Sequence, residues 1–376
     1  MIVIYAAFIG LGLPDSLLGA AWPAMRPDLG ASMSGAGFVS LIVCAGTVIS
    51  SLVSNVVLRR FQVGGVILAS VLLTALALLG TAWAGSFSHL CLLAIPLGLG
   101  AGSIDAALNN FVALNHKARH MNWLHCFWGA GATSGPLILA FFMGKNLSWR
   151  WGYAAIGALQ FCLVIVLFFS LPLWKRANGS ACYGGRSLTN GEALRVPGVK
   201  YALLSFLCYC GLELSTGLWA ASYLVQQKGL VESTAAAWTS CYYGSITAGR
   251  FVSGFISLKV SGPKLIRLGC VVSAAGMVML LLPPMGSLAG LILIGLGCAP
   301  FYPAMIHETP KRFGKRASQA AMGLQMASAY VGSTFLPPLA GILSVSLSML
   351  PWYLLLLAAG MFLFSERLSR ETSRVC

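Results

Sequence analysis

Three acidic residues stand out because each lies within a run of apolar residues long enough to cross a lipid bilayer. They are Asp15, Asp105 and Glu213. A charged carboxyl at bilayer depth costs roughly 2.5–3.5 kcal/mol on insertion scales, so such residues are retained only against a compensating use. No Lys or Arg falls in the middle of any of these runs. We therefore expect all three acids to lack a membrane-buried base as a partner.

A carboxyl without a buried base must be protonated or must face water. Removal from water favours the protonated acid over the carboxylate, so such a group can bind and release protons near neutral pH. We predict on this basis that Asp15 and Asp105 are proton-coupling residues. For Glu213 we predict a hydrogen bond to substrate hydroxyl groups, with a structural or proton-carrying role as the alternative.

Polar and aromatic residues accompany these acids at helical spacing. Asp105 and Asn109 are four apart and share one helical face, and Asn122, His125 and Trp128 follow one another at intervals of three. Such side chains suit sugar hydroxyls or a sugar ring face, whereas the alternative is polar contact between packed helices. The predicted substrate-binding residues are Asn109, Asn110, Asn122, His125, Trp128, Gln160, Glu213, Trp219, Tyr302, Gln325 and Tyr330.

The composition indicates which elements must position these residues. Of 376 residues, 58% are hydrophobic and only 9% are charged, whereas soluble domains are about 25% charged. Repeated apolar runs of about 20 residues match the hydrocarbon core of a bilayer. We predict an all-α polytopic membrane protein. Its twelve predicted spans lie near residues 2–24, 35–57, 64–84, 89–114, 122–143, 151–173, 200–225, 234–257, 264–284, 288–308, 318–343 and 346–364.

The net charge of +15 follows from where the basic residues lie. Nineteen of the 24 Lys and Arg residues fall in one alternating set of loops and tails, and four fall in the opposite set. Arg250 lies toward the basic end of the eighth span. Basic loops stay in the cytoplasm, so we expect both termini to be cytoplasmic and expect no nucleic-acid partner.

The two halves of the chain repeat one another. At an offset of 198 residues Asp15 aligns with Glu213, and at 197 Asp105 aligns with Tyr302. Parallel six-span repeats related by an axis along the membrane normal are a known transporter architecture. We predict four segments: a bundle at 1–173, a cytoplasmic linker at 174–199, a second bundle at 200–364 and a cytoplasmic tail at 365–376.

Four stretches carry a family resemblance: GLPDSLLGAAWPAM (12–25), GLGAGSIDAALNNFVALNH (98–116), MNWLHCFWGAGATSGP (121–136) and GLELSTGLWAASYLV (211–225). The chain resembles the major facilitator superfamily over nearly its whole length, and within it the bacterial fucose/galactose/glucose:proton symporters. The resemblance implies the major facilitator fold, a bacterial inner-membrane location and functional carboxyls at Asp15 and Asp105. One departure is the loop after the second span, which reads SNVVLRR and lacks the family's usual Asp.

The sign of the buried charge restricts the substrate. Without a buried base the chain is poorly suited to anions, so we expect a neutral sugar carried together with protons by alternating access. Proton-coupled efflux of cationic or amphipathic drugs is the main alternative, and a sensor without transport is another. We find no metal-type spacing, nucleotide loop or catalytic constellation, so we expect no enzyme activity, no metal and no cofactor. We expect a monomer in the lipid bilayer.

Overall fold

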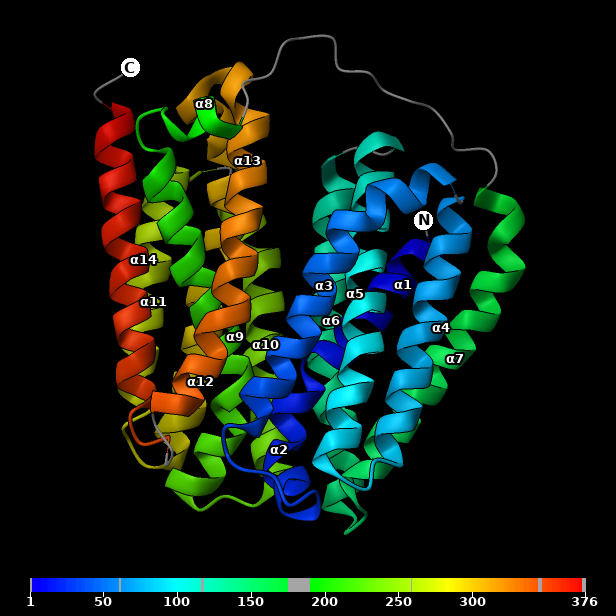
Figure 1. Ribbon diagram of the computed structural model, residues 1–376. Coiled ribbons are helices and arrows are strands. Elements are labelled where there is room, and N and C mark those ends of the chain that lie inside the picture. Colours follow the sequence, from blue (N-terminus) through cyan, green and yellow to red (C-terminus); the bar gives the residue numbers. More distant parts are fainter. Residues whose placement is uncertain are drawn as a thin grey trace. The chain divides into compact units, whose positions relative to one another are not determined.

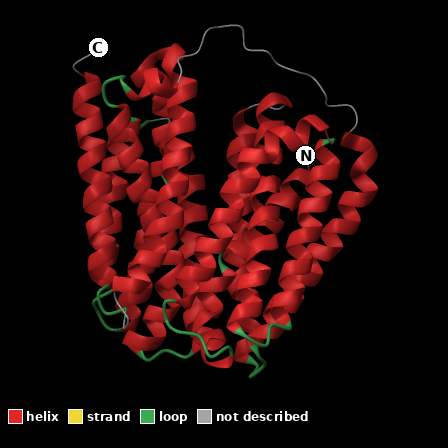
Figure 2. Ribbon diagram, in the orientation of Figure 1, coloured by secondary structure: helices red, strands yellow, loops and turns green. Residues whose placement is uncertain are grey.

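The computed structural model describes residues 2–60, 62–115, 118–174, 190–257, 259–343 and 347–373, and within these ranges every regular element is an α-helix (Figures 1 and 2). The predicted all-α fold class is therefore confirmed. The helices are α1 (Ile2–Asp15), α2 (Leu17–Asp28), α3 (Gly35–Arg60), α4 (Val63–Ala82), α5 (Phe87–Asn115), α6 (Ala118–Gly144), α7 (Trp149–Trp174), α8 (Asn190–Leu194), α9 (Val199–Lys228), α10 (Glu232–Ile256), α11 (Gly262–Met279), α12 (Pro284–Cys298), α13 (Phe301–Leu343) and α14 (Leu350–Ser373).

The helices other than α8 follow the order of the predicted spans, although some spans consist of two helices. The first span is α1 with α2, spans two to six are α3–α7, and spans seven to nine are α9–α11. The tenth span is α12 with the start of α13, the eleventh is the rest of α13, and the twelfth is α14. Within the described ranges ten stretches are long and apolar enough to cross a membrane, and α3 adds a shorter apolar helix at Gly35–Ser50.

The first span is broken because of Pro14. A proline inside a helix has no N–H group, so the carbonyl four residues earlier, that of Gly10, loses its helical donor. Backbone groups at membrane depth must be satisfied within the protein. The buried side-chain amide of Gln160 on α7 donates to this Gly10 carbonyl. The break places Asp15 at the end of α1, with Ser16 between the two helices.

Two further breaks lie in the second half of the chain. The helix is interrupted between Cys298 and Phe301, next to Pro300. Within α13, Gly314 has a positive φ of 73°, which a residue without a Cβ atom adopts readily. Gly314 thereby separates the predicted tenth span from the eleventh.

The chain forms two compact units. The first holds α1–α7 (blue to green in Figure 1) with residues 220–225 and 229–240, and the second holds α8, the remainder of α9 and α10, and α11–α14. In the first unit, a Cβ atom on Gly131 of α6 would overlap the carbonyl oxygen of Ile9 on α1. In the second, a Cβ atom on Gly332 of α13 would overlap the carbonyl oxygen of Leu207 on α9. Both units therefore use a glycine to bring two helix backbones into contact, as small residues commonly do in membranes.

The close contact between α1 and α6 gives a first prediction. Gly131→Ala is expected to lower the free energy of unfolding by about 1–3 kcal/mol, the typical cost of overpacking, because its methyl group has no space beside Ile9. Thermal unfolding of the purified protein in detergent measures the effect. Gly144→Ala, near the end of the same helix with nothing within 4 Å of the added Cβ atom, is the matched control. Equal melting temperatures for the two variants would contradict the prediction.

Candidate functional site

The first unit brings together the two acids predicted to couple protons. The side chain of Asp15 is exposed, and the indole nitrogen of Trp128 on α6 donates a hydrogen bond to its Oδ2 atom over 2.7 Å. Asp105 on α5 is half-buried, and its carboxylate interacts electrostatically with that of Asp15. Two carboxyls and an indole from three helices thus form one site, although the proton-coupling role itself stays a prediction.

The backbone contact between α1 and α6 explains how the indole reaches the acid. A Cβ atom on Gly12 would overlap the backbone carbonyl of Trp128, so these two helices touch without an intervening side chain. The hydroxyl of Ser16 donates to the carbonyl of Ala132 over 2.7 Å, one turn beyond Trp128. Contacts on both sides of Asp15 therefore fix its position relative to α6.

The other predicted residues of the first unit fall into two groups. His125 is half-buried on α6, and its ring lies edge-on to Phe8 with the ring centroids 6.0 Å apart. Asn109, Asn110 and Asn122 lie on the helices α5 and α6, but their side chains are outside the described part of the structure. Substrate binding by these four residues stays a prediction.

The expectation that all three acids lack a base is wrong for Glu213. The Nη2 atom of Arg250 on α10 lies 3.0 Å from Oε1 of Glu213 on α9, and the two side chains are only 13% and 7% exposed. The prediction failed because Arg250 lies toward the end of its span, where a long basic side chain often extends to the polar interface. Here the guanidinium instead binds the acid of the neighbouring helix.

Two tyrosines that were not among the predicted site residues complete this cluster. The Nη2 atom of Arg250 also donates to the hydroxyl of Tyr209 over 3.2 Å. The hydroxyl of Tyr242 donates to the backbone carbonyl of Glu213 over 2.9 Å. A sequence signal existed for the first, because Tyr209 and Glu213 are four apart and so share one face of α9. The Tyr209 ring stacks on Phe301 with the centroids 4.7 Å apart.

Three predicted substrate-binding residues are engaged in contacts between helices. Trp219 is completely buried, and its indole donates to the carbonyl of Pro337 over 2.7 Å. Gln325 is 1% exposed and accepts a hydrogen bond from the hydroxyl of Thr309 over 3.1 Å. Gln160 binds the carbonyl left free by the helix break. These contacts agree with the alternative that polar side chains join packed helices, and substrate binding by these residues stays a prediction.

Two tyrosines of the second unit keep partial exposure. Tyr302 donates its hydroxyl to the sulfur of Met326 over 3.2 Å, and Tyr330 is likewise half-buried. Both remain predicted substrate contacts.

Charged residues near the end of the tenth span form a salt-bridge cluster. Glu308 lies 3.1 Å from the ammonium of Lys311 and 3.8 Å from a ring nitrogen of His307.

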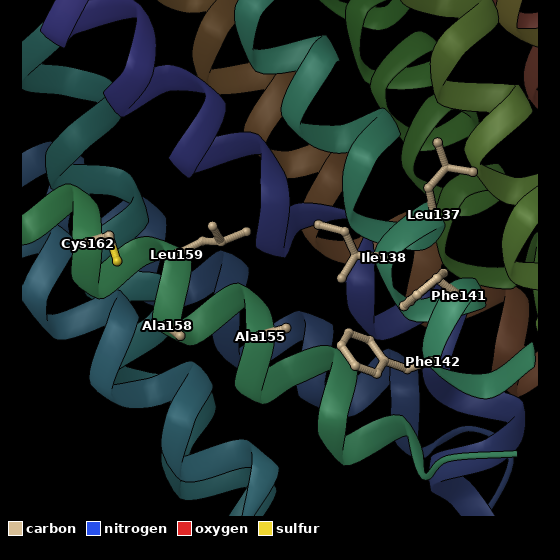
Figure 3. Close-up of a pocket in the computed structure, with 8 residues that line it drawn as sticks. All are labelled: Leu137, Ile138, Phe141, Phe142, Ala155, Ala158, Leu159 and Cys162. Carbon is tan, nitrogen blue, oxygen red and sulfur yellow. The ribbon is translucent and has the colours of Figure 1, made fainter. Parts of the chain in front are cut away.

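A groove on the first unit differs in character from the acidic site. It lies between α6 and α7 and is lined by apolar side chains, as Figure 3 shows. Leu137, Phe141 and Leu159 at this groove are about half exposed, at 49%, 57% and 51%. Such a surface suits the acyl chains of lipid and provides few polar groups for a sugar.

The family of the chain is established by comparison with known proteins. The family model described as the Major Facilitator Superfamily matches residues 4–306 and 201–366, which together cover nearly the whole chain. The chain therefore belongs to the Major Facilitator Superfamily, a superfamily of membrane transporters and not of enzymes.

Individual relatives with curated names share low sequence identity with this chain, and each is longer than it. The chain is 27% identical over 286 residues to "Bypass of stop codon protein 6" of Saccharomyces cerevisiae, which covers 66% of this chain and 55% of that protein. It is 25% identical over 230 residues to the glucose/mannose transporter GlcP of Bacillus subtilis, covering 57% of this chain and 56% of GlcP. It is 23% identical over 307 residues to sodium-dependent glucose transporter 1 of Danio rerio, covering 72% and 51%. The matched segments thus span about half the length of these relatives.

Solved structures share the fold. A bacterial homolog of the human lysosomal transporter Spinster matches with a TM-score of 0.78 and 12% identity, covering 98% of this chain and 97% of that one. The nucleoside transporter NupG, in a mutant form, matches with a TM-score of 0.77 and 15% identity, covering 98% of each chain. At this level of identity the similarity is one of fold.

Proposed function

We propose that this chain is a secondary active transporter that carries a neutral sugar together with protons by alternating access. The observation that carries the proposal is the exposed carboxylate of Asp15, whose hydrogen-bond donor is the neutral indole of Trp128 and whose neighbour is a second acid, Asp105. An acid in this setting can bind a proton from water, unlike Glu213, which is paired with Arg250. The relatives named as glucose transporters support a sugar as the substrate.

Topology and location are part of the same proposal. The distribution of Lys and Arg supports cytoplasmic termini, and the resemblance to bacterial symporters supports the bacterial inner membrane. We propose a monomer as the transporting form, because each half supplies one repeat of the fold.

The proposal is tested by uptake into proteoliposomes that contain the purified protein. Radiolabelled D-glucose and D-mannose are offered under an inward proton gradient, an inward sodium gradient or neither, with a labelled nucleoside as a further substrate. Accumulation of a hexose that requires the proton gradient supports the proposal. Accumulation that requires only sodium, or accumulation only of the nucleoside, contradicts it.

One observation supports a second candidate function, proton-coupled efflux of cationic compounds. An exposed carboxylate such as Asp15 beside a second acid would also attract a cationic substrate. Expression in a host that lacks its own efflux pumps separates the two functions. Resistance to cationic dyes without hexose uptake supports efflux, and hexose uptake without resistance supports the sugar transporter.

A further inference from the structure

The bond between Trp128 and Asp15 joins two features that the sequence places in separate motifs. Asp15 ends α1 at the break caused by Pro14, and Trp128 lies on the face of α6 that touches this break. An indole has one N–H donor and no acceptor, so it can stabilise a carboxylate without exchanging a proton with it. The 2.7 Å distance is typical of a hydrogen bond to an ionised acceptor.

We propose that Trp128 is a positioning residue that holds the carboxylate form of Asp15 and thereby sets the pH range over which the transporter takes up its proton. This inference rests on the proposed function and assigns Trp128 a role other than the predicted contact with substrate. In the proton-binding step, a proton from water adds to a carboxylate oxygen of Asp15, and the indole keeps its own hydrogen. The charge-assisted bond then becomes a weaker bond to a neutral acid.

The backbone makes this pairing specific. On one side of the pair the Ser16 hydroxyl binds the Ala132 carbonyl, and on the other Gly12 lies against the backbone of Trp128. Neither contact involves the carboxylate. The two helices therefore stay together when the bond to Asp15 weakens, so protonation changes the hydrogen bond and not the helix packing.

Among the side chains that the structure describes, few other charged groups lie on the helices packed around α1. Asp105 on α5 is a second acid, whose charge interacts with that of Asp15. From α6 comes His125, three residues before Trp128 and against Phe8. The helix α4 carries no charged residue, and α7 contributes the neutral amide of Gln160. The other charged or titratable residues of these helices lie near helix ends. His89 is in the first turn of α5, and Arg119 and His120 are in the first turn of α6, with side chains outside the described part of the structure. Arg150 of α7 donates to the carbonyls of Ala82 and Ala84, and α2 ends with Arg26 and Asp28, of which Asp28 accepts a hydrogen bond from the indole of Trp149.

The experiment compares the pH dependence of hexose uptake by the wild-type protein and by Trp128→Phe in proteoliposomes. Phe keeps an aromatic ring but cannot donate, so the carboxylate loses stabilisation relative to the protonated acid. The external pH of half-maximal uptake is expected to rise by about one unit, which corresponds to a roughly tenfold change in proton affinity. Trp128→Tyr, which restores a donor, is expected to show a smaller rise. An unchanged pH of half-maximal uptake in a folded Trp128→Phe protein overturns the inference.

The matched control is Trp123→Phe. Trp123 lies on the same helix five residues before Trp128, a spacing that directs the two side chains to different faces of α6, and it is 46% exposed. The Trp123→Phe variant is expected to leave the pH of half-maximal uptake unchanged. A shift equal to that of Trp128→Phe would show a general effect of substitutions in α6 and would overturn the inference.

A second measurement does not depend on transport. Infrared difference spectra recorded over a pH titration detect protonated carboxyl groups, and the band absent in Asp15→Asn is that of Asp15. Its midpoint is expected to move to higher pH in Trp128→Phe, and an unmoved midpoint overturns the inference even if the protein transports nothing. Absence of proton-dependent uptake by the wild type, with a midpoint that moves, refutes the proposed function but leaves the pairing intact.

Discussion

Asp15→Asn is expected to abolish the accumulation of sugar while exchange of sugar across the membrane continues. A membrane potential of 100 mV supplies about 2.3 kcal/mol per proton. If one proton enters with each neutral solute molecule, this energy sustains an internal concentration about 50-fold above the external one. Asn can still accept the hydrogen bond of Trp128 but cannot bind a proton. The internal sugar concentration should therefore fall from about 50-fold above the external one to equality with it. The measurement is steady-state uptake of labelled hexose, with counterflow as the assay for exchange.

The control for this prediction is an acid outside the site. Glu232 is exposed in the first turn of α10, so Glu232→Gln removes one negative charge without changing the acidic cluster. It should accumulate sugar as the wild type does. Undiminished accumulation by Asp15→Asn would refute a coupling role for this residue, and loss of both accumulation and exchange would indicate a role in substrate binding instead.

The buried ion pair of the second unit gives the prediction with the next largest effect. Arg250→Met is expected to lower the free energy of unfolding by about 3–5 kcal/mol, because it leaves the carboxyl of Glu213 buried without its basic partner. The double variant Glu213→Gln with Arg250→Met removes both charges and is expected to recover most of that loss. Chemical or thermal unfolding of the single and double variants measures the coupling between the two residues.

An exposed pair serves as the comparison. Arg267 of α11 binds Glu366 of α14 through two hydrogen bonds, but its side chain is 51% exposed. Arg267→Met should destabilise the protein far less than Arg250→Met, because salt bridges at exposed sites contribute little to stability. If the double variant of the buried pair is no more stable than Arg250→Met, the ion pair does not explain the loss. If the double variant is stable but transports no sugar, Glu213 or Arg250 contributes to substrate binding as well.

The two repeat-related acids have diverged in their environments. At the offset of 198 residues that aligns Asp15 with Glu213, Arg250 aligns with Leu52, so the first half has no equivalent base. Asp15 instead has the neutral donor Trp128, which aligns with Tyr330 at an offset of 202. The structure therefore supports assigning the proton to the first half and a stabilising charge pair to the second.

Helix positions could be predicted from the chain because burial in lipid imposes a length and a composition on each span. Pro14 likewise marks a break in the first span, since proline cannot complete the helical hydrogen bonds. The partner that satisfies the freed carbonyl of Gly10 could not be predicted, because Gln160 lies 150 residues away on another helix.

The sequence by itself determined the class of fold, the order of the spans, the internal repeat and which acids fall within apolar runs, because these follow from hydropathy and spacing along one chain. Only the tertiary structure decided which of those acids is neutralised. Arg250 reaches Glu213 across 37 residues and Trp128 reaches Asp15 across 113. A carboxylate is stabilised by whatever lies within about 3 Å of its oxygens, and the packing of helices distant in sequence determines what that is.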